Sequence, residues 1–192
     1  MQSNNIITET VPPQRDFNYL RWNFKDNPDY SKYDIIIFTD GASHTELMGG
    51  FGAVIMSTKY PALAYKKAYG CSNNTNTGRA ELFAIVHALH TALNTLREEG
   101  GFDPESIKEM CPSVLVLSDR WDVVGKAARE FKRGVDKDLW LAYEYYTEYF
   151  DVMVRHIPRD TMPTHKIVDA IASELRIVLI DFSESQTDAK HI

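Results

Sequence analysis

Four acidic residues occupy comparable positions beside apolar segments. Asp40 and Asp119 each follow a short apolar run, whereas Glu81 and Asp169 each lie near the start of a segment with helical apolar spacing. Carboxylates that converge on one point repel one another unless cations lie between them, and hard oxygen ligands suit Mg²⁺ or Mn²⁺. Two such ions can activate a water molecule and stabilise the leaving oxygen of a phosphodiester. The pattern predicts metal-dependent phosphodiester hydrolysis.

Each acid also has a structural explanation when it is taken alone. Asp40 precedes Gly41, and Asp-Gly is a common turn signal. Glu81 is expected in the first turn of its helix, where the helix dipole favours an acid. The opposing argument is the cost of burial, because a carboxylate on a core strand is unfavourable unless it is paired or bound to a cation.

The apolar pattern predicts how these acids are positioned. The run Ile35–Phe38 and a second run that resumes at Phe51 are expected to form a hairpin, with a polar turn from Gly41 to Gly50. Three further strands are expected at Ala62–Tyr69, Ser113–Ser118 and Asp151–Ile157. Helices are expected at Arg79–Glu99, over most of Arg120–Lys137, at Asp138–Phe150 and at His165–Leu179. This order predicts an α/β fold, with a five-stranded mixed sheet of three antiparallel strands and then βα units, flanked by helices.

Length and composition are those of one globular domain with extensions. We expect a polar N-terminal extension over residues 1–33, the domain over 34–180 and a polar tail over 181–192. No run approaches the length of a membrane span, so no membrane association is expected. The two cysteines form no disulfide framework, which favours a reduced, cytoplasmic setting, and we expect a monomer.

Charge is distributed unevenly along the chain. The net charge of −6 argues against non-specific binding to nucleic acid. The segment from Arg120 to Lys137, however, contains six basic residues and three acidic ones. A basic helix is often only a solvated face, but this one directly follows Asp119, so phosphate contacts are the alternative.

Several motifs in this order resemble those of type 1 ribonuclease H, from about Tyr33 to Leu179. The matching motifs are Phe38-Thr39-Asp40-Gly41, Gly49-Gly50-Phe51-Gly52-Ala53, Arg79-Ala80-Glu81-Leu82, Leu117-Ser118-Asp119 and Val168-Asp169-Ala170-Ile171-Ala172. The resemblance implies a ribonuclease H-like fold and an endonuclease that hydrolyses the RNA strand of RNA–DNA hybrids. It also implies two Mg²⁺ ions, for which Mn²⁺ can substitute, held by Asp40, Glu81, Asp119 and Asp169.

The loop before the last helix departs from the family pattern. The family has a Gly-His-x-Gly loop there, and Arg159 stands at the position of the histidine. His165 is a candidate replacement base, one turn before Asp169, and His156 is an alternative if the loop takes another route. Either histidine can also be a surface or capping residue.

The substrate contacts implied by the resemblance are altered as well. Asn76-Thr77-Gly78 stands where the family often has paired asparagines that contact the minor groove of the substrate. A protein can distinguish RNA from DNA by the 2′-hydroxyl of RNA. The altered residues therefore place specificity for hybrids in question. The connection after Asp119 is too short for a large basic protrusion. The helix that follows Asp119 is therefore expected to hold the DNA strand. The residues expected to contact nucleic acid are Gly41, Asn76, Thr77, Gly78, Arg79, Arg120, Trp121, Lys126, Arg129 and Arg159.

Two other functions are compatible with the sequence. One is a related nuclease of the same superfamily, acting on DNA junctions, double-stranded RNA or single strands. The other is a catalytically degenerate domain that binds nucleic acid or protein. The altered histidine loop favours the second, whereas retention of all four acids opposes it.

Overall fold

The computed structural model describes residues 7–9, 30–44, 48–73, 75–158 and 166–173. The strands are β1 (Ile7–Glu9), β2 (Ile35–His44), β3 (Met48–Met56), β4 (Lys66–Asn73), β5 (Ser113–Ser118) and β6 (Asp151–His156). The helices are α2 (Thr77–Glu98), α3 (Pro104–Met110), α4 (Trp121–Ala127) and α5 (Lys137–Tyr146), with 3-10 turns at Tyr30–Lys32 and Pro61–Leu63. Residues 166–173 form a further helical segment. No helix in these ranges is long and apolar enough to cross a membrane.

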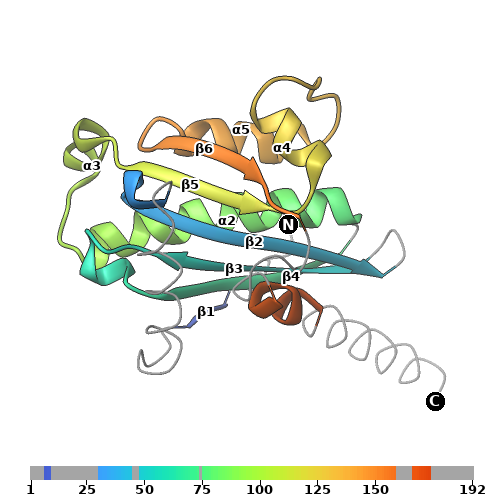
Figure 1. Ribbon diagram of the computed structural model, residues 1–192, viewed down its shortest axis with the longest axis horizontal. Coiled ribbons are helices and arrows are strands. Elements are labelled where there is room, and N and C mark those ends of the chain that lie inside the picture. The colour runs from blue at the N-terminus through green and yellow to red at the C-terminus, as the bar shows by residue number, and fades with distance from the viewer. Residues whose placement is uncertain (1–6, 10–29, 45–47, 74, 159–165, 174–192) are drawn as a thin grey trace, which may run out of the picture.

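The strands form one mixed sheet in the order β1-β4-β3-β2-β5-β6 (Figure 1). Strands β2, β3 and β4 are antiparallel neighbours, whereas β5 and β6 join the other side of β2 in parallel. The predicted mixed sheet of five strands is therefore confirmed. A sixth, short strand is added by β1, which pairs with the outer edge of β4 and comes from the predicted N-terminal extension.

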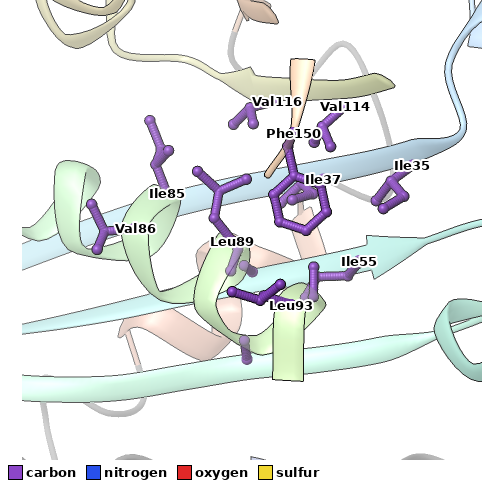
Figure 2. Packing of buried hydrophobic residues seen from close by; sticks show 14 of the residues in the cluster. Ile35, Ile37, Ile55, Ile85, Val86, Leu89, Leu93, Val114, Val116 and Phe150 are labelled. Carbon is purple, nitrogen blue, oxygen red and sulfur yellow. The ribbon is translucent and has the colours of Figure 1, made fainter. Parts of the chain in front are cut away.

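The run Ile35–Phe38 is apolar throughout because helices cover both faces of the sheet. Side chains alternate between the faces of a strand. Ile35 and Ile37 accordingly lie in one buried cluster, with α2, while Ile36 and Phe38 lie in another. Figure 2 shows the first cluster, where Ile85 and Leu89 of α2 face the sheet. Val168 of the segment 166–173 belongs to the second cluster.

The hairpin differs from its prediction in where it turns. Strand β2 continues past Asp40 to His44, and its ladder with β3 runs to the pair His44↔Met48. The predicted turn from Gly41 to Gly50 is therefore wrong, because most of it is paired strand. The glycines mark close contacts rather than a turn. A Cβ atom on Gly49 would lie 2.6 Å from Cγ2 of Thr75.

Other boundaries shift for local reasons. The third strand is β4, which begins at Lys66 and not at Ala62, because Pro61 begins a 3-10 turn. The short helix α3 was not predicted, although Asp103 caps it and Pro104 opens it. The helix predicted over most of Arg120–Lys137 is longer than the helix α4 that the structure contains there.

Helix α4 ends at Ala127, after about two turns. The Arg133 guanidinium then donates to the carbonyl oxygens of Lys126 and Ala127, which satisfies acceptors at the helix end. Arg129 has a left-handed backbone, with φ of 61°, which is incompatible with a continuing helix. The predicted last helix is found at 166–173, and its remaining residues lie outside the described ranges.

Gly41 determines how closely α2 approaches the sheet. A Cβ atom at this position would lie 2.3 Å from the backbone nitrogen of Glu81 and 2.8 Å from its Cα. No side chain fits such a gap, so only glycine allows α2 to pack here. The same contact fixes the position of Glu81 relative to β2.

We expect Gly41→Ala to destabilise the protein by roughly 1–3 kcal/mol or more, because the added methyl group must displace helix backbone. Urea unfolding measures this change. The matched control is Gly134→Ala, because apart from its chain neighbours no atom of the described residues lies within 4 Å of the added Cβ. This variant should leave stability unchanged or slightly raised. Equal stabilities for the two variants would contradict the close approach.

Candidate active site

Two of the four acids are placed by the parallel pairing of β2 with β5. The last aligned pair in this ladder is Phe38↔Leu117. Asp40 and Asp119 each lie two residues beyond that pair, so they reach the same level at the carboxyl end of the strands. Ligand sites of α/β sheets form at this end.

Glu81 reaches the same point from α2. The helix begins at Thr77, so Glu81 is its fifth residue and lies beyond the first turn, contrary to the prediction. The helix dipole is therefore a weaker explanation for an acid here, since its effect declines after the first turn. The Oγ of Ser118, which is fully buried, approaches a Glu81 carboxylate oxygen at 3.5 Å.

Asp40, Glu81 and Asp119 converge. One carboxylate oxygen from each residue lies within 4.8 Å of the other two. Asp40 and Glu81 are each only 2% exposed, whereas Asp119 is half-buried. The fourth predicted acid, Asp169, is half-buried and lies close enough to Asp40 to hydrogen bond with it.

Burial and repulsion between charges raise the pKa values of Asp40 and Glu81 in the metal-free protein. Burial raises the pKa of Asp40 to about 7, with contributions from its hydrogen bond to Asp169 and the charge of Asp119. Burial and the charges of Asp40 and Asp119 raise the pKa of Glu81 well above its ordinary value.

The residues present fit a divalent cation. The Oδ1 of Asp40 accepts a hydrogen bond from the backbone N–H of Gly41 at 2.9 Å. Among the residues that the structure describes, the buried Oδ2 of Asp40 has no hydrogen-bond partner. A buried carboxylate oxygen without a donor is costly, and a cation would compensate it together with the adjacent negative charges. The ligand atoms are all carboxylate oxygens, which Mg²⁺ and Mn²⁺ prefer.

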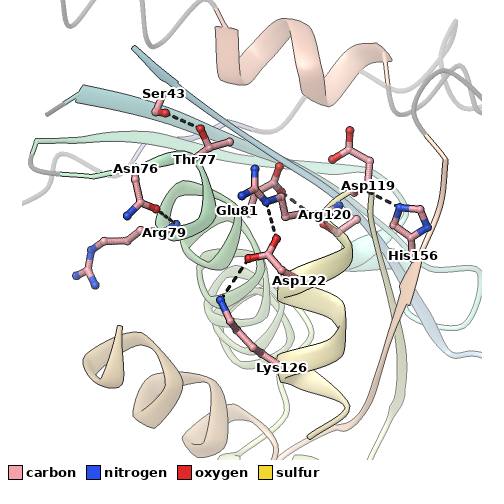
Figure 3. Close-up of polar contacts among 11 residues, drawn as sticks. Ser43, Asn76, Thr77, Arg79, Glu81, Asp119, Arg120, Asp122, Lys126 and His156 are labelled. Atoms are coloured by element: carbon pink, nitrogen blue, oxygen red, sulfur yellow. Dashed lines mark hydrogen bonds and ion pairs between the residues drawn. The ribbon is translucent and has the colours of Figure 1, made fainter. Parts of the chain in front are cut away.

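The predicted substrate residues of α2 surround the amino end of that helix. Asn76 caps the helix by accepting from the backbone N–H of Arg79 at 2.9 Å. The Thr77 hydroxyl lies 2.6 Å from that of Ser43, which ties α2 to β2 beyond Asp40 (Figure 3). A Cβ on Gly78 would lie 4.0 Å from the guanidinium of Arg120, so this turn borders the start of α4.

The predicted basic residues are mostly engaged with acids of the protein. Arg79 forms ion pairs with Asp136 and Asp138 near the start of α5. Arg129, whose side chain is 76% exposed, contacts Glu144 at 3.3 Å. These contacts do not exclude a role with substrate, because exposed ion pairs are weak.

Asp122 joins two further basic residues beside the acids. It accepts from Arg120 at 2.6 Å and from Lys126 at 3.2 Å, as Figure 3 shows. The Arg120 backbone N–H in turn donates to the Ser118 hydroxyl. Neither Ser118 nor Asp122 was singled out in the sequence, although Ser118 belongs to the motif that carries Asp119.

The predicted histidine roles differ in how far they can be placed. His165 and Arg159 lie outside the described residues. His156 lies at the end of β6, and its Nε2 contacts the backbone carbonyl oxygen of Asp119 at 3.1 Å (Figure 3). It is therefore adjacent to the acid cluster without its imidazole being bonded to a carboxylate in any contact that the structure defines.

Comparison with solved structures identifies the architecture. The N-terminal ribonuclease H domain of Rv2228c from Mycobacterium tuberculosis superimposes with a TM-score of 0.60, covering 79% of this chain and 99% of that domain at 15% identity. The chain has the ribonuclease H fold. LC11-RNase H1 in complex with an RNA/DNA hybrid matches with a TM-score of 0.58, 19% identity and coverage of 76% and 99%.

RNase H1 of the archaeon Halobacterium salinarum also matches this chain, with a TM-score of 0.51 and 23% identity. The match covers 73% of this chain and 96% of the archaeal one. No family model matches the sequence, and no curated protein sequence matches it significantly. The ribonuclease H fold predicted from the motifs is confirmed at the level of architecture.

The raised pKa of Asp40 predicts a pH-dependent effect of Asp40→Asn on stability without metal. A folded-state pKa near 7, against 3.8 in the unfolded chain, stabilises the wild type most below pH 4, and this contribution is lost as the pH rises to 7. The asparagine variant avoids that loss, so its stability advantage should be near zero at pH 4 and grow until about pH 7.

Urea unfolding of both proteins in EDTA, from pH 4 to 8, measures this difference. The difference between the two proteins is the appropriate quantity because His87, whose pKa is lowered to about 4 by burial, gives both of them an opposite pH trend. A constant difference across the range would show that Asp40 is ionised throughout.

Proposed function

We propose that this protein is an endonuclease that hydrolyses the RNA strand of RNA–DNA hybrids with two divalent cations. The observation that carries the proposal is the convergence of Asp40, Glu81 and Asp119 within 4.8 Å. One buried Asp40 oxygen also lacks a hydrogen-bond partner within the described part of the chain. Burying three acids together is unfavourable for stability, so a compensating role in cation binding explains their placement better than a structural one.

Asp40, Glu81, Asp119 and Asp169 would hold the cations. When bound, Mg²⁺ supplies an activated water and neutralises charge on the phosphate. The carboxylates position the ions, and the buried contact of Gly41 with Glu81 keeps the ligand set rigid. The half-buried position of Asp119 gives the cluster an open side towards substrate.

The likeness to a known hybrid-binding protein supports the choice of substrate. LC11-RNase H1, which shares the fold, has been solved with an RNA/DNA hybrid. In this chain the amino end of α2 and the start of α4 lie together beside the acids, where they can border a bound strand. Hydroxyl groups at Ser43 and Thr77 offer hydrogen-bonding atoms on that side.

Cleavage assays on matched substrates test the function. The RNA strand of an RNA–DNA hybrid should be cut in Mg²⁺ or Mn²⁺, whereas duplex DNA should not. Asp119→Asn should slow cleavage by at least about 100-fold, because losing an ion ligand should exceed the effect of losing its supporting shell. Preferential cleavage of duplex RNA or single strands would instead indicate a related nuclease.

Metal binding provides an independent readout. Mg²⁺ should raise the melting temperature of the wild type, since a ligand that binds only the folded state stabilises it. Asp40→Asn should lose most of this increase while remaining folded. If Mg²⁺ and Mn²⁺ leave the wild-type melting temperature unchanged and no substrate is cut, the domain is a non-catalytic one.

The basic residues after α4 should contribute to binding through interactions with phosphate. We expect the double variant Arg129→Gln, Lys132→Gln to lower hybrid affinity and to reduce the slope of log K against log salt by up to roughly 0.9 for each phosphate that is no longer neutralised. Fluorescence anisotropy with non-cleaving Asp119→Asn protein measures the slope. Lys108→Gln is the control, since Lys108 lies on α3, far from α4 (Figure 1), where it pairs with Glu148. An equal effect of this substitution would exclude a specific contact of Arg129 and Lys132 with phosphate.

A further inference from the structure

Trp121 is an unusually exposed aromatic side chain beside the acid cluster. It opens α4 two residues after Asp119, and it is 60% exposed. A single exposed apolar side chain needs no special explanation. The way in which this one is held is more informative.

Two rings contact Trp121, one from β6 and one from the loop that follows α4. The His156 ring of β6 lies nearly perpendicular to the indole, with ring centroids 5.7 Å apart and an interplanar angle of 86°. The Phe131 ring lies at 6.3 Å and 70°. Both neighbours are themselves anchored. His156 contacts the carbonyl oxygen of Asp119.

Phe131 rests on a glycine of α4. A Cβ on Gly125 would lie 2.4 Å from the Phe131 ring, so the ring lies directly against the helix backbone. Trp121 is therefore in contact with two flanking rings, although the residue as a whole stays 60% exposed. Such restraint reduces the entropy that a ligand must overcome on contact.

We propose that Trp121 is a stacking platform for one unpaired nucleobase next to the phosphodiester that the acid cluster cleaves. This inference rests on the proposed nuclease function. An aromatic side chain stacks on any base, because every base has a π face. The chain of contacts from Trp121 through His156 to Asp119 places the platform at the edge of the site.

The platform narrows the class of substrate. A base inside a continuous duplex is already stacked on both faces and offers none to Trp121. A base at a strand end, a bulge or a nick has an accessible face. The preferred substrate is therefore a hybrid whose base pairing is interrupted beside the scissile phosphate.

Binding to three short hybrids tests this inference. One is fully paired, one carries a single bulged adenosine in the RNA strand, and one carries an abasic residue in that bulge. All proteins carry Asp119→Asn to prevent cleavage. The bulged adenosine should bind roughly 5- to 100-fold more tightly than its abasic counterpart, because only the base is missing.

Trp121→Ala should abolish that difference, and Trp121→Phe should retain most of it because an aromatic ring remains. Leu141→Ala, which removes another exposed apolar side chain on α5, should have no effect. Because Trp121 is exposed, its variants should keep the wild-type melting temperature. The stacking proposal is overturned if the bulged and abasic hybrids bind equally, or if Trp121→Ala weakens all three to the same extent.

The outcomes also separate this inference from the function on which it rests. Hybrids that are bound without any base-dependent difference overturn the stacking platform alone. If no hybrid binds and the wild-type protein cuts none, the proposed function fails as well.

Discussion

Electrostatic repulsion among buried carboxylates is the constraint around which this structure is arranged. Asp40 and Glu81 are almost fully buried, and with Asp119 they form a cluster that is unstable when fully ionised. Without metal, burial and mutual repulsion raise the pKa values of Asp40 and Glu81. Asp40 comes from β2 and Glu81 from α2, and Asp119 is the residue directly after β5. The packing of these three elements against one another therefore has to compensate the unfavourable electrostatic energy of the site.

Much of this arrangement follows from local patterns in the sequence. The continuous apolar run Ile35–Phe38 correctly indicated a buried strand, and β5 was predicted with its observed limits. The four acids were identified because each stood beside an apolar segment, and the structure brings three of them within reach of one ion and the fourth next to Asp40.

Features that depend on long-range contacts were predicted less well. Gly41 and Gly49 suggested a turn, yet they lie in paired strands and allow close packing between elements distant in sequence. The early end of α4 depends on Arg133, whose bonds to helix carbonyls have no local signature. The position of Trp121 likewise depends on a contact with the His156 ring of β6, a strand that begins thirty residues later in the chain.

The alternation of side chains along β2 couples the two layers that cover the sheet, so that their opening should be cooperative. Gly41 faces α2, whereas Asp40 pairs across the sheet with Gly52, whose Cα faces Ile171 in the segment 166–173. Asp40 and Gly41, which are adjacent in the chain, thus connect the acid cluster to both layers that cover the sheet. A cation held by Glu81 from one layer and Asp169 from the other would act as a cross-link between them. Partial opening of either layer would release the ion, so occupancy would slow hydrogen exchange in both layers together.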